Sequence, residues 1–202
     1  MLAAKLRKNE KLIGSIRQDS FVIICSGCSE VYLPEDEIRA FLAENGIEKT
    51  VRADYLCREE FCKIYAQKHS EALSSSGNVI VFSCGVGVQA MAKTIEGKEV
   101  LPGCDTFYLK GFQGFKSQQR DCEQCAECRL NETGAICPLT SCSKSLINGP
   151  CGGAKDGKCE VNREMDCGWE LIYKRLEKQA REHLLSGESK TRDYQKLITG
   201  GK

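Results

Sequence analysis

The sequence lacks an excess of charge of one sign, a long hydrophobic run and a supply of histidine. Lysine plus arginine number 29 against 28 for aspartate plus glutamate, so the formal net charge is +1. Such balance gives no reason to expect binding to nucleic acid or to an anionic membrane. No stretch approaches the roughly 18 apolar residues of a membrane span, and residues 1–20 carry charges where a secretory signal has its apolar centre. We therefore expect a soluble, cytoplasmic protein.

Histidine is scarce whereas cysteine is abundant, with 2 histidines and 14 cysteines in 202 residues. Chains this rich in cysteine are usually secreted disulfide scaffolds or intracellular metal proteins, and close Cys-x-x-Cys spacings favour metal. Zinc sites often mix cysteine with histidine, whereas iron–sulfur clusters are held mainly by thiolates. The composition therefore favours iron and sulfide, with all-cysteine zinc sites and disulfides as the alternatives.

Strand and helix patterns alternate through residues 20–110. Short β-branched or apolar runs, which predict strands, lie at residues 21–24, 49–56, 78–82, 99–101 and 106–109. The segments between them have helical spacing, with acidic residues in the expected first turns and glycine or serine at the ends. Alternation at this spacing predicts a small doubly wound α/β domain built on a parallel sheet.

Three other segments flank this domain. Residues 1–19 carry leucine and isoleucine at helical spacing among lysine and arginine, which predicts a helical arm. Residues 111–185 begin with a linker and form a cysteine-rich metal-binding region with little regular structure, closed by a C-terminal helix that starts near Trp169. The tail, residues 186–202, is polar, and we expect it to be partly disordered or ordered only against a partner.

The segment Cys122-Glu-Gln-Cys125-Ala-Glu-Cys128 is the sharpest local signal. Two-residue gaps let a looping backbone direct successive thiolates at one cubane cluster while its amides face the cluster sulfides. The run resembles the bacterial ferredoxin pattern, except that Cys137, followed by proline, comes after eight residues instead of three. The fourth ligand could be Cys137 or one of the later cysteines Cys151, Cys159 and Cys167.

The second half of the chain has enough cysteines for two four-ligand sites. They are Cys122, Cys125, Cys128, Cys137, Cys142, Cys151, Cys159 and Cys167. The last four stand among glycines, which let a backbone wrap closely around a cluster. A structural zinc ribbon and disulfides are the alternatives.

The remaining cysteines follow the strands expected in the α/β domain. In a parallel sheet, residues just after the strands share the carboxyl edge, where ligands bind. There are six such cysteines, whereas one four-coordinate site needs only four ligands. Our first choice of ligands is Cys25, Cys28, Cys62 and Cys84, with Cys57 and Cys104 as substitutes. Zinc or a cluster could occupy this third site, and the alternative for each cysteine is a small buried hydrophobe.

The other motifs in the sequence give weaker indications of function. Gly85-Val-Gly87 opens an expected helix and could cradle a phosphate, but it lacks the third glycine of a dinucleotide fingerprint. His69 and His183 fall on expected helices and are interpreted as surface or packing residues. The sequence shows no convincing pair of nucleophile and base and no carboxylate dyad, so we assign no catalytic residue.

The second half of the chain resembles the methylenetetrahydrofolate reductase C-terminal domain. The most specific part of the match is Lys144-Ser-Leu-Ile-Asn-Gly-Pro-Cys-Gly-Gly153, followed by Gly157-Lys-Cys-Glu160. The likeness extends upstream through residues 83–89 and 101–111, and it covers nearly the whole span 20–185. Relatives often carry a further cysteine shortly after the first Cys-x-x-Cys, where this chain has residues 31–33, Val-Tyr-Leu. That departure bears on the ligand set of the N-terminal site.

The resemblance implies the small iron–sulfur subunit of a two-subunit methylenetetrahydrofolate reductase of anaerobic bacteria. It implies two [4Fe-4S] clusters, or three if the N-terminal set also holds one, with zinc as the alternative at one site. FMN would be bound only by the catalytic partner, which reduces methylenetetrahydrofolate to methyltetrahydrofolate. This chain would pass electrons to it from ferredoxin or another redox protein, with no nucleic acid or membrane as partner. The alternatives are a zinc-stapled assembly module of the same complex and a methyl-group transferase with thiolate-bound zinc.

Overall fold

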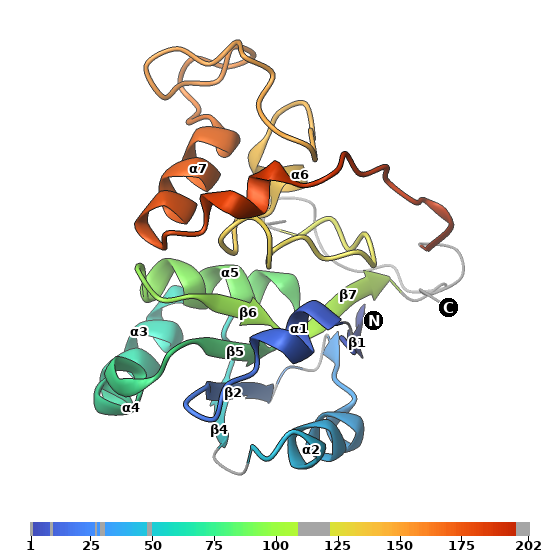
Figure 1. The fold of residues 1–202 in the computed structure, drawn as a ribbon, viewed down its shortest axis with the longest axis vertical. Helices are drawn as coiled ribbons and strands as arrows, with labels where there is room; N and C mark the ends of the chain where they lie inside the picture. The colour runs from blue at the N-terminus through green and yellow to red at the C-terminus, as the bar shows by residue number, and fades with distance from the viewer. Residues whose placement is uncertain are drawn as a thin grey trace.

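The α/β domain lies below a loop-rich, cysteine-containing region in the view of Figure 1, and strand β7 and helix α5 lie next to the junction. The structure is a computed structural model. It describes residues 2–8, 10–26, 28, 31–47, 50–108 and 122–196. No helix within these ranges is long and apolar enough to span a membrane.

A four-stranded parallel sheet in the order β4-β2-β5-β6 forms the centre of the α/β domain. Its strands are β2 (Phe21–Ser26), β4 (Thr50–Asp54), β5 (Val79–Phe82) and β6 (Val100–Pro102). In the central register, Ile23 lies opposite Val51 on one side and Val81 on the other. Continuous apolar runs suit a parallel sheet because both of its faces are buried. The prediction of a small α/β domain on a parallel sheet is confirmed.

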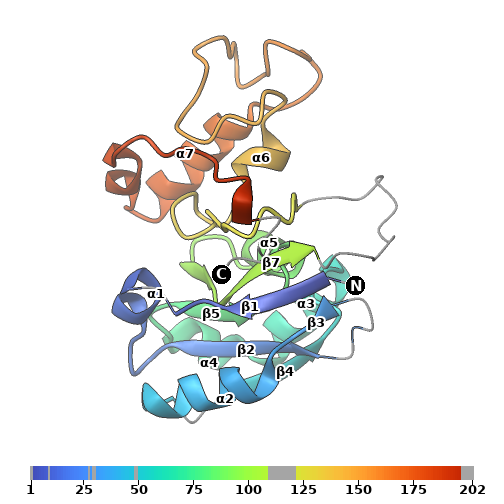
Figure 2. The ribbon, with the colours of Figure 1, turned by 90° about the vertical axis from the view of Figure 1, so that its right-hand side faces the viewer.

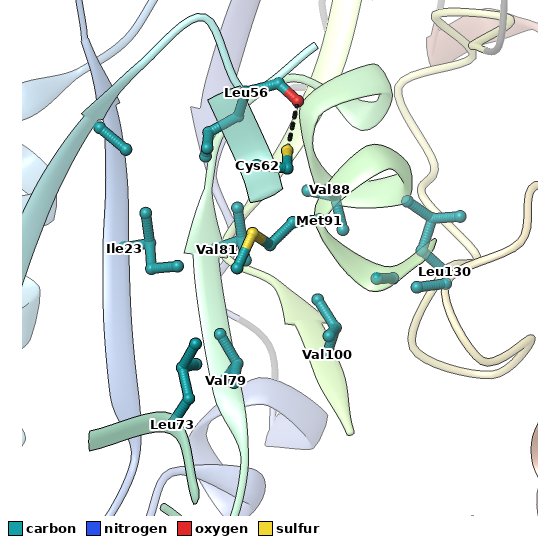
Figure 3. Packing of buried hydrophobic residues seen from close by; sticks show 13 residues of the cluster. Ile23, Leu56, Cys62, Leu73, Val79, Val81, Val88, Met91, Val100 and Leu130 are labelled. Carbon is teal, nitrogen blue, oxygen red and sulfur yellow. Dashed lines mark hydrogen bonds between the residues drawn. The ribbon is translucent and has the colours of Figure 1, made fainter. Parts of the chain in front are cut away.

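Helices cover both faces of this sheet because successive residues of each strand point to opposite sides. Val79 and Val81 face one layer, where they pack with Met91 (Figure 3), whereas Ile80 and Phe82 face the other. The first layer consists of α3 (Glu59–Lys68), α4 (Ser70–Ser75) and α5 (Gly85–Thr94). The second layer consists of α1 (Glu10–Ser15) and α2 (Glu35–Glu44).

A second, three-stranded sheet has the order β3-β1-β7. Its strands are β1 (Leu2–Leu6), β3 (Val31–Tyr32) and β7 (Cys104–Tyr108), and β1 runs antiparallel to β7. The helical arm expected over residues 1–19 is therefore helical only in α1. Ala4 and Leu6 alternate into the core, and pairing along the whole of β7 overrides the helical spacing of this segment.

The cysteine-rich region contains only short regular elements and a small core of its own. These elements are α6 (Pro138–Ser141), α7 (Gly168–Lys178) and the 3₁₀ helix η2 (Glu182–Ser186). Trp169, Ile172 and Leu176 of α7 form the core, which confirms the expected C-terminal helix. The linker expected at residues 111–119 lies outside the described residues.

The region docks on the α/β domain through its last helices, which lie above α5 in both ribbon views (Figures 1 and 2). Arg175 Nη1 donates a hydrogen bond to the carbonyl oxygen of Ala92 at 3.2 Å, and Arg181 pairs with Glu99 at 2.8 Å. Farther along the chain, Lys190 exchanges two hydrogen bonds with Asn148. Part of the expected tail is thus attached to the rest of the chain.

Candidate metal centres

Two sets of four cysteines line two separate cavities. The first cavity, of about 600 Å³, lies at the carboxyl edge of the parallel sheet, and its cysteines are Cys25, Cys28, Cys57 and Cys84. The second lies between α5, β7 and the start of the cysteine-rich region, and its cysteines are Cys122, Cys125, Cys128 and Cys137. We call these the sheet-edge site and the loop site.

The sheet-edge site is built where three neighbouring parallel strands end. Cys25 lies near the end of β2, Cys57 follows β4, and Cys84 follows β5 as the residue that precedes α5. Burial raises the pKa of Cys84 to about 11, although the amides of Gly87 and Val86 oppose this effect. Metal binding by Cys84 must therefore displace a proton from its thiol.

Cys62 and Cys104 lie outside both cavities. Cys62 is fully buried on the inner face of α3, and its sulfur donates a hydrogen bond to the carbonyl oxygen of Leu56 at 3.1 Å (Figure 3). Cys104 begins β7 and packs in the core beside Leu6. Cys57, which the sequence analysis names only as a substitute, lines the same cavity as Cys25, Cys28 and Cys84. Cys57 lies three residues after the end of β4 and Cys84 two residues after the end of β5, and this shared place beyond a strand is the signal that favours Cys57.

The loop site depends on a backbone that turns sharply between its cysteines. Gln124 and Ala126 have positive φ angles of 52° and 55°, a region that residues other than glycine rarely adopt. Such conformations cost of order 1–3 kcal/mol each and persist only where the surroundings impose them. The two-residue gaps therefore form the looping backbone that the spacing predicts.

Backbone groups two positions farther along the chain contact two of the three sulfurs in this loop. Gln124 N donates a hydrogen bond to Cys122 Sγ at 3.5 Å, and Cys125 Sγ donates to the Glu127 carbonyl oxygen at 3.3 Å. Burial raises the pKa of all three thiols, to about 12 for Cys122, and hydrogen bonds with the backbone of Gln124, Glu127 and Leu130 oppose the rise. Amide hydrogen bonds to sulfur are a recurrent device for stabilising metal-bound thiolates.

The first turn of α5 forms one wall of the loop site. A Cβ atom on Gly85 would lie 2.9 Å from Cys122 Sγ, so the helix approaches the sulfur closely only because this residue is glycine. Gly85 N donates to Thr106 Oγ1 at 2.9 Å, and Cys137 N donates to Gln89 Oε1 at 3.0 Å. A helix N-terminus favours negative charge, so this wall suits thiolates.

Arg7 and Asp105 hold the last cysteine of the loop from both sides of its backbone. Arg7 Nη2 donates to the Cys128 carbonyl oxygen at 2.6 Å, and the Cys128 amide donates to Asp105 Oδ1 at 3.0 Å. The two side chains lie 3.7 Å apart and are largely buried. Burial raises the pKa of Asp105, and the charge of Arg7 opposes that rise.

Buried nitrogen atoms around the loop site indicate that it suits an anionic group. In the described part of the chain, buried side-chain nitrogens without a hydrogen-bond partner belong to Arg7, Arg129, Arg192 and Asn131. Arg7 contacts the loop backbone, and Arg129 lines the cavity. A buried cationic N–H without an acceptor is unfavourable. A metal centre carried by four thiolates is negatively charged and would lie next to these groups, so the residues fit such a centre.

The last four cysteines lie in the loops around α6 and α7. Cys142 and Cys167 pack against the small core at Trp169. Cys159 Sγ lies 3.5 Å from Ser143 Oγ, and this contact, with the amides of Val161 and Asn162, lowers the pKa of Cys159. This cysteine is thus disposed to act as a thiolate.

Cys151 is the most exposed member of this set. Its sulfur lies 3.4 Å from Glu160 Oε1, and Glu160 forms an ion pair with Lys144. A Cβ atom on Gly153 would clash with the Glu160 side chain, so the backbone here must follow that side chain closely. Neither His69 nor His183 lines a cysteine cavity; His69 instead packs against the ring of Phe21.

Within the described ranges, no three His, Cys, Asp or Glu side chains are grouped tightly enough to hold one metal ion as they stand. The cavities therefore gather the cysteines without bringing their sulfurs to one point.

These features define an α/β protein with sets of cysteines suited to metal binding. Residues 101–195 match the family described as methylene-tetrahydrofolate reductase C terminal. This match confirms the resemblance seen in the sequence of that segment. Neither a curated protein nor a solved structure matches the chain. The matched segment contains the loop site and the last four cysteines, whereas the cysteines of the sheet-edge site precede it.

Proposed function

We propose that this chain is the iron–sulfur electron-transfer subunit of a methylenetetrahydrofolate reductase complex. The observation that carries the proposal is the loop site, because it combines four cysteines, a backbone amide directed at Cys122 Sγ and unpaired buried arginine nitrogens. It also lies inside the segment that matches the reductase family. We assign no catalytic residue to this chain.

The cysteines divide into three ligand sets. The loop site, Cys122, Cys125, Cys128 and Cys137, would hold one [4Fe-4S] cluster. A second cluster would be held by Cys142, Cys151, Cys159 and Cys167. The sheet-edge site, Cys25, Cys28, Cys57 and Cys84, would hold a third cluster or a zinc ion.

Iron–sulfur clusters carry single electrons, whereas a flavin stores two. Such centres would connect a one-electron donor, ferredoxin or another redox protein, to FMN in a catalytic partner subunit. The partner would reduce 5,10-methylenetetrahydrofolate to 5-methyltetrahydrofolate. The residues of this chain bind the centres, exclude water from the loop site and set its electrostatic environment.

The two cysteine cavities are neighbours, which supports electron exchange between them. Cys84 lines the sheet-edge site, and the next residue, Gly85, forms the wall of the loop site against Cys122. Burial raises the pKa of Cys122 to about 12, and the nearby Cys84 contributes to that rise. The start of α5 thus separates the two sets by little more than one residue of backbone.

The first test is the metal content of the anaerobically purified chain. Iron, acid-labile sulfide and zinc are measured per polypeptide, and visible spectra are recorded before and after dithionite. About eight or more irons with matching sulfide, together with bleaching near 400 nm, would support the proposal. Colourless protein with zinc alone would contradict the proposal and would favour a structural assembly module in which zinc only stabilises the fold.

Paired cysteine variants test the ligand assignment. Cys125→Ala should remove the iron of one cluster, whereas Cys104→Ala should retain all of it, because Cys104 lies in the core. At the sheet edge, Cys57→Ala should lose the metal and Cys62→Ala should keep it. Full metal in Cys57→Ala with loss in Cys62→Ala would restore Cys62 as the ligand.

The complex with the FMN-bearing subunit provides the functional test. Cys125→Ala should lower electron transfer from a reduced dye to the FMN while the flavin stays bound to its own subunit. Cys104→Ala is the matched control and should transfer electrons at the normal rate. Equal rates in both variants would contradict the proposed role of the loop site.

A further inference from the structure

Three arginines from distant parts of the chain surround the loop site. Arg7 follows β1, Arg129 follows the cysteine loop, and Arg192 lies in the C-terminal tail. Each has at least one buried side-chain nitrogen without a hydrogen-bond partner. Apart from Asn131, no other residue in the described ranges has such a nitrogen.

Arg7 reaches the site from the N-terminal strand, 121 residues away in sequence from the cysteine it contacts. Its Nη2 atom is committed to the Cys128 carbonyl oxygen, but Nε and Nη1 are buried and unpaired. Asp105 lies 3.7 Å from Nε, which is beyond hydrogen-bond distance. The guanidinium thus retains two donor nitrogens, Nε and Nη1, for a further acceptor.

Arg129 is 8% exposed and lines the cavity of the loop site. Its Nη2 lies 3.6 Å from Glu127 Oε2, too far for a hydrogen bond, and has no other acceptor. The Glu127 carboxylate therefore offsets the charge of Arg129 without accepting a hydrogen bond from Nη2.

The C-terminal tail is attached to the rest of the chain both before and after Arg192, and this holds Arg192 near the loop site. Lys190 exchanges two hydrogen bonds with Asn148 and forms an ion pair with Glu132. Farther along, Lys196 pairs with Glu127 at 3.1 Å. Burial raises the pKa of Cys125, and the charge of Arg192, which lies between these attachments, acts against the rise.

We infer that these arginines form a cationic shell that stabilises the reduced state of the centre at the loop site. The inference rests on the proposed function, since it concerns an iron–sulfur centre held by this chain's cysteines. Adding an electron makes such a centre more negative, so nearby buried cations favour the reduced form and raise its reduction potential. The negative charges of Asp105 and Glu127 partly offset the positive charges of Arg7 and Arg129. Neither carboxylate accepts a hydrogen bond from the arginine nitrogens named above.

The test is an anaerobic redox titration of the full, cluster-loaded chain, followed by electron paramagnetic resonance. The signal of the loop site is identified as the one that Cys125→Ala removes. Arg129→Gln and Arg192→Gln remove one charge each, whereas Arg129→Lys and Arg192→Lys keep it. Arg39→Gln is the control, because Arg39 is an exposed residue of α2 far from the cysteine loop.

At the wild-type midpoint potential, each glutamine variant should lower the ratio of reduced to oxidised centre by about three- to tenfold. A tenfold change corresponds to about 59 mV for one electron. The lysine variants should stay within about twofold of wild type, because they retain the charge. The control should not move.

Two results would overturn the inference while leaving the proposed function intact. One is an unchanged midpoint in iron-replete Arg129→Gln and Arg192→Gln. The other is an equal shift in the lysine and glutamine variants, which would show that shape and not charge matters. Wild-type chain that contains zinc and no iron would instead overturn the proposed function and the inference together. Arg7→Gln is a secondary variant, because loss of its bond to Cys128 can also lower iron content.

Discussion

The α/β domain and the cysteine-rich region are stabilised in different ways. In the α/β domain, two large apolar clusters cover both faces of the sheet and include fully buried residues such as Ile80, Phe82 and Met91. In the cysteine-rich region, the separate core is limited to Trp169, Ile172 and Leu176 with a few half-buried neighbours. Burial of apolar area is the main favourable term in folding, so the second region has much less of it.

The difference shows what the cysteine-rich region needs from elsewhere. Its loops around Cys151 and Cys159 are held by polar contacts near the surface. Its helices dock on the α/β domain through Arg175 and Arg181. Metal bound by thiolates supplies folding free energy where a core cannot. We therefore expect the α/β domain to keep its fold without metal and the cysteine-rich loops to lose theirs.

Metal removal should have the largest effect, and it tests the difference between the two regions most directly. In chelator-treated, anaerobic protein, backbone amides of residues 142–167 should exchange with solvent at rates near those of an unfolded chain. Amides of β5 should remain protected, because that strand is central and fully buried. Hydrogen exchange measured by mass spectrometry checks both segments. Equal protection of residues 142–167 with and without metal would contradict the proposed dependence.

Gly85→Val should affect the junction between the two regions. The new Cβ would meet Cys122 Sγ at 2.9 Å, so α5 or the cysteine loop must shift. We expect loss of the loop-site iron with the remaining metal retained, measured by metal analysis and by the signal that Cys125→Ala removes. Gly14→Ala is the control, because a Cβ atom there meets nothing within 4 Å. Full iron in Gly85→Val would show that the close approach is not required.

Core truncations compare the two regions by free energy. Ile23→Ala should lower the free energy of unfolding of the α/β domain by about 2–5 kcal/mol, the usual cost of a buried large-to-small change. Ile172→Ala should destabilise only the cysteine-rich region. Urea unfolding of the metal-loaded protein separates the two, because the single tryptophan, Trp169, reports on the cysteine-rich region and far-UV circular dichroism on the whole chain. Coincident transitions in both variants would indicate one cooperative unit instead.

The sequence predicts the α/β domain well because its signals are local. Apolar runs such as Val79–Phe82, followed by a glycine-containing turn, indicate strand and helix without knowledge of the rest of the chain. Strand β1 is missed because Ala4 and Leu6 are also good helix formers, and only pairing with β7 decides their structure. A local sequence pattern does not show with which distant segment a strand will pair.

The same distinction holds for the candidate metal centres. Spacing alone indicates Cys122, Cys125 and Cys128, because adjacent thiolates are positioned by two-residue gaps. Spacing does not decide between Cys57 and Cys62, since the choice depends on which face of α3 packs on the sheet. The arginines of the loop site leave no sequence signal, because Arg7 and Arg192 approach it from opposite ends of the chain.

Docking between the regions should contribute less than either core. Arg181 and Glu99 are about 14% and 17% exposed and lie 2.8 Å apart. Removing one partner leaves a partly buried charge unpaired, so Arg181→Ala should cost about 1–3 kcal/mol. A double-mutant cycle with Glu99→Ala isolates the pair, and the Trp169 transition is the readout. A coupling energy near zero would show that the docking is independent of this ion pair.

The smallest effect should come from an exposed ion pair within the α/β domain. Arg52 Nη2 lies 2.6 Å from Glu35 Oε2, and both side chains are about half exposed, so the pair is worth about 0.2–1 kcal/mol. The hydrogen bond and charge of Arg52 lower the pKa of Glu35 below its ordinary value.

Because the pKa of Glu35 is lower in the folded state, its stabilisation is fully present above the ordinary pKa of a glutamate. It is lost as the pH falls through the lower, folded value. The free energy of unfolding of Glu35→Gln, measured with urea, should therefore fall below that of wild type at pH 7, and the gap should close under strongly acidic conditions. Lys174→Gln is the control, because its contact with Glu170 is longer, 3.8 Å, and lies in α7, outside the α/β domain. A gap that persists in acid would mean that Glu35 acts through packing and not through charge, and the α/β domain would then rely on apolar and van der Waals contacts even at its surface.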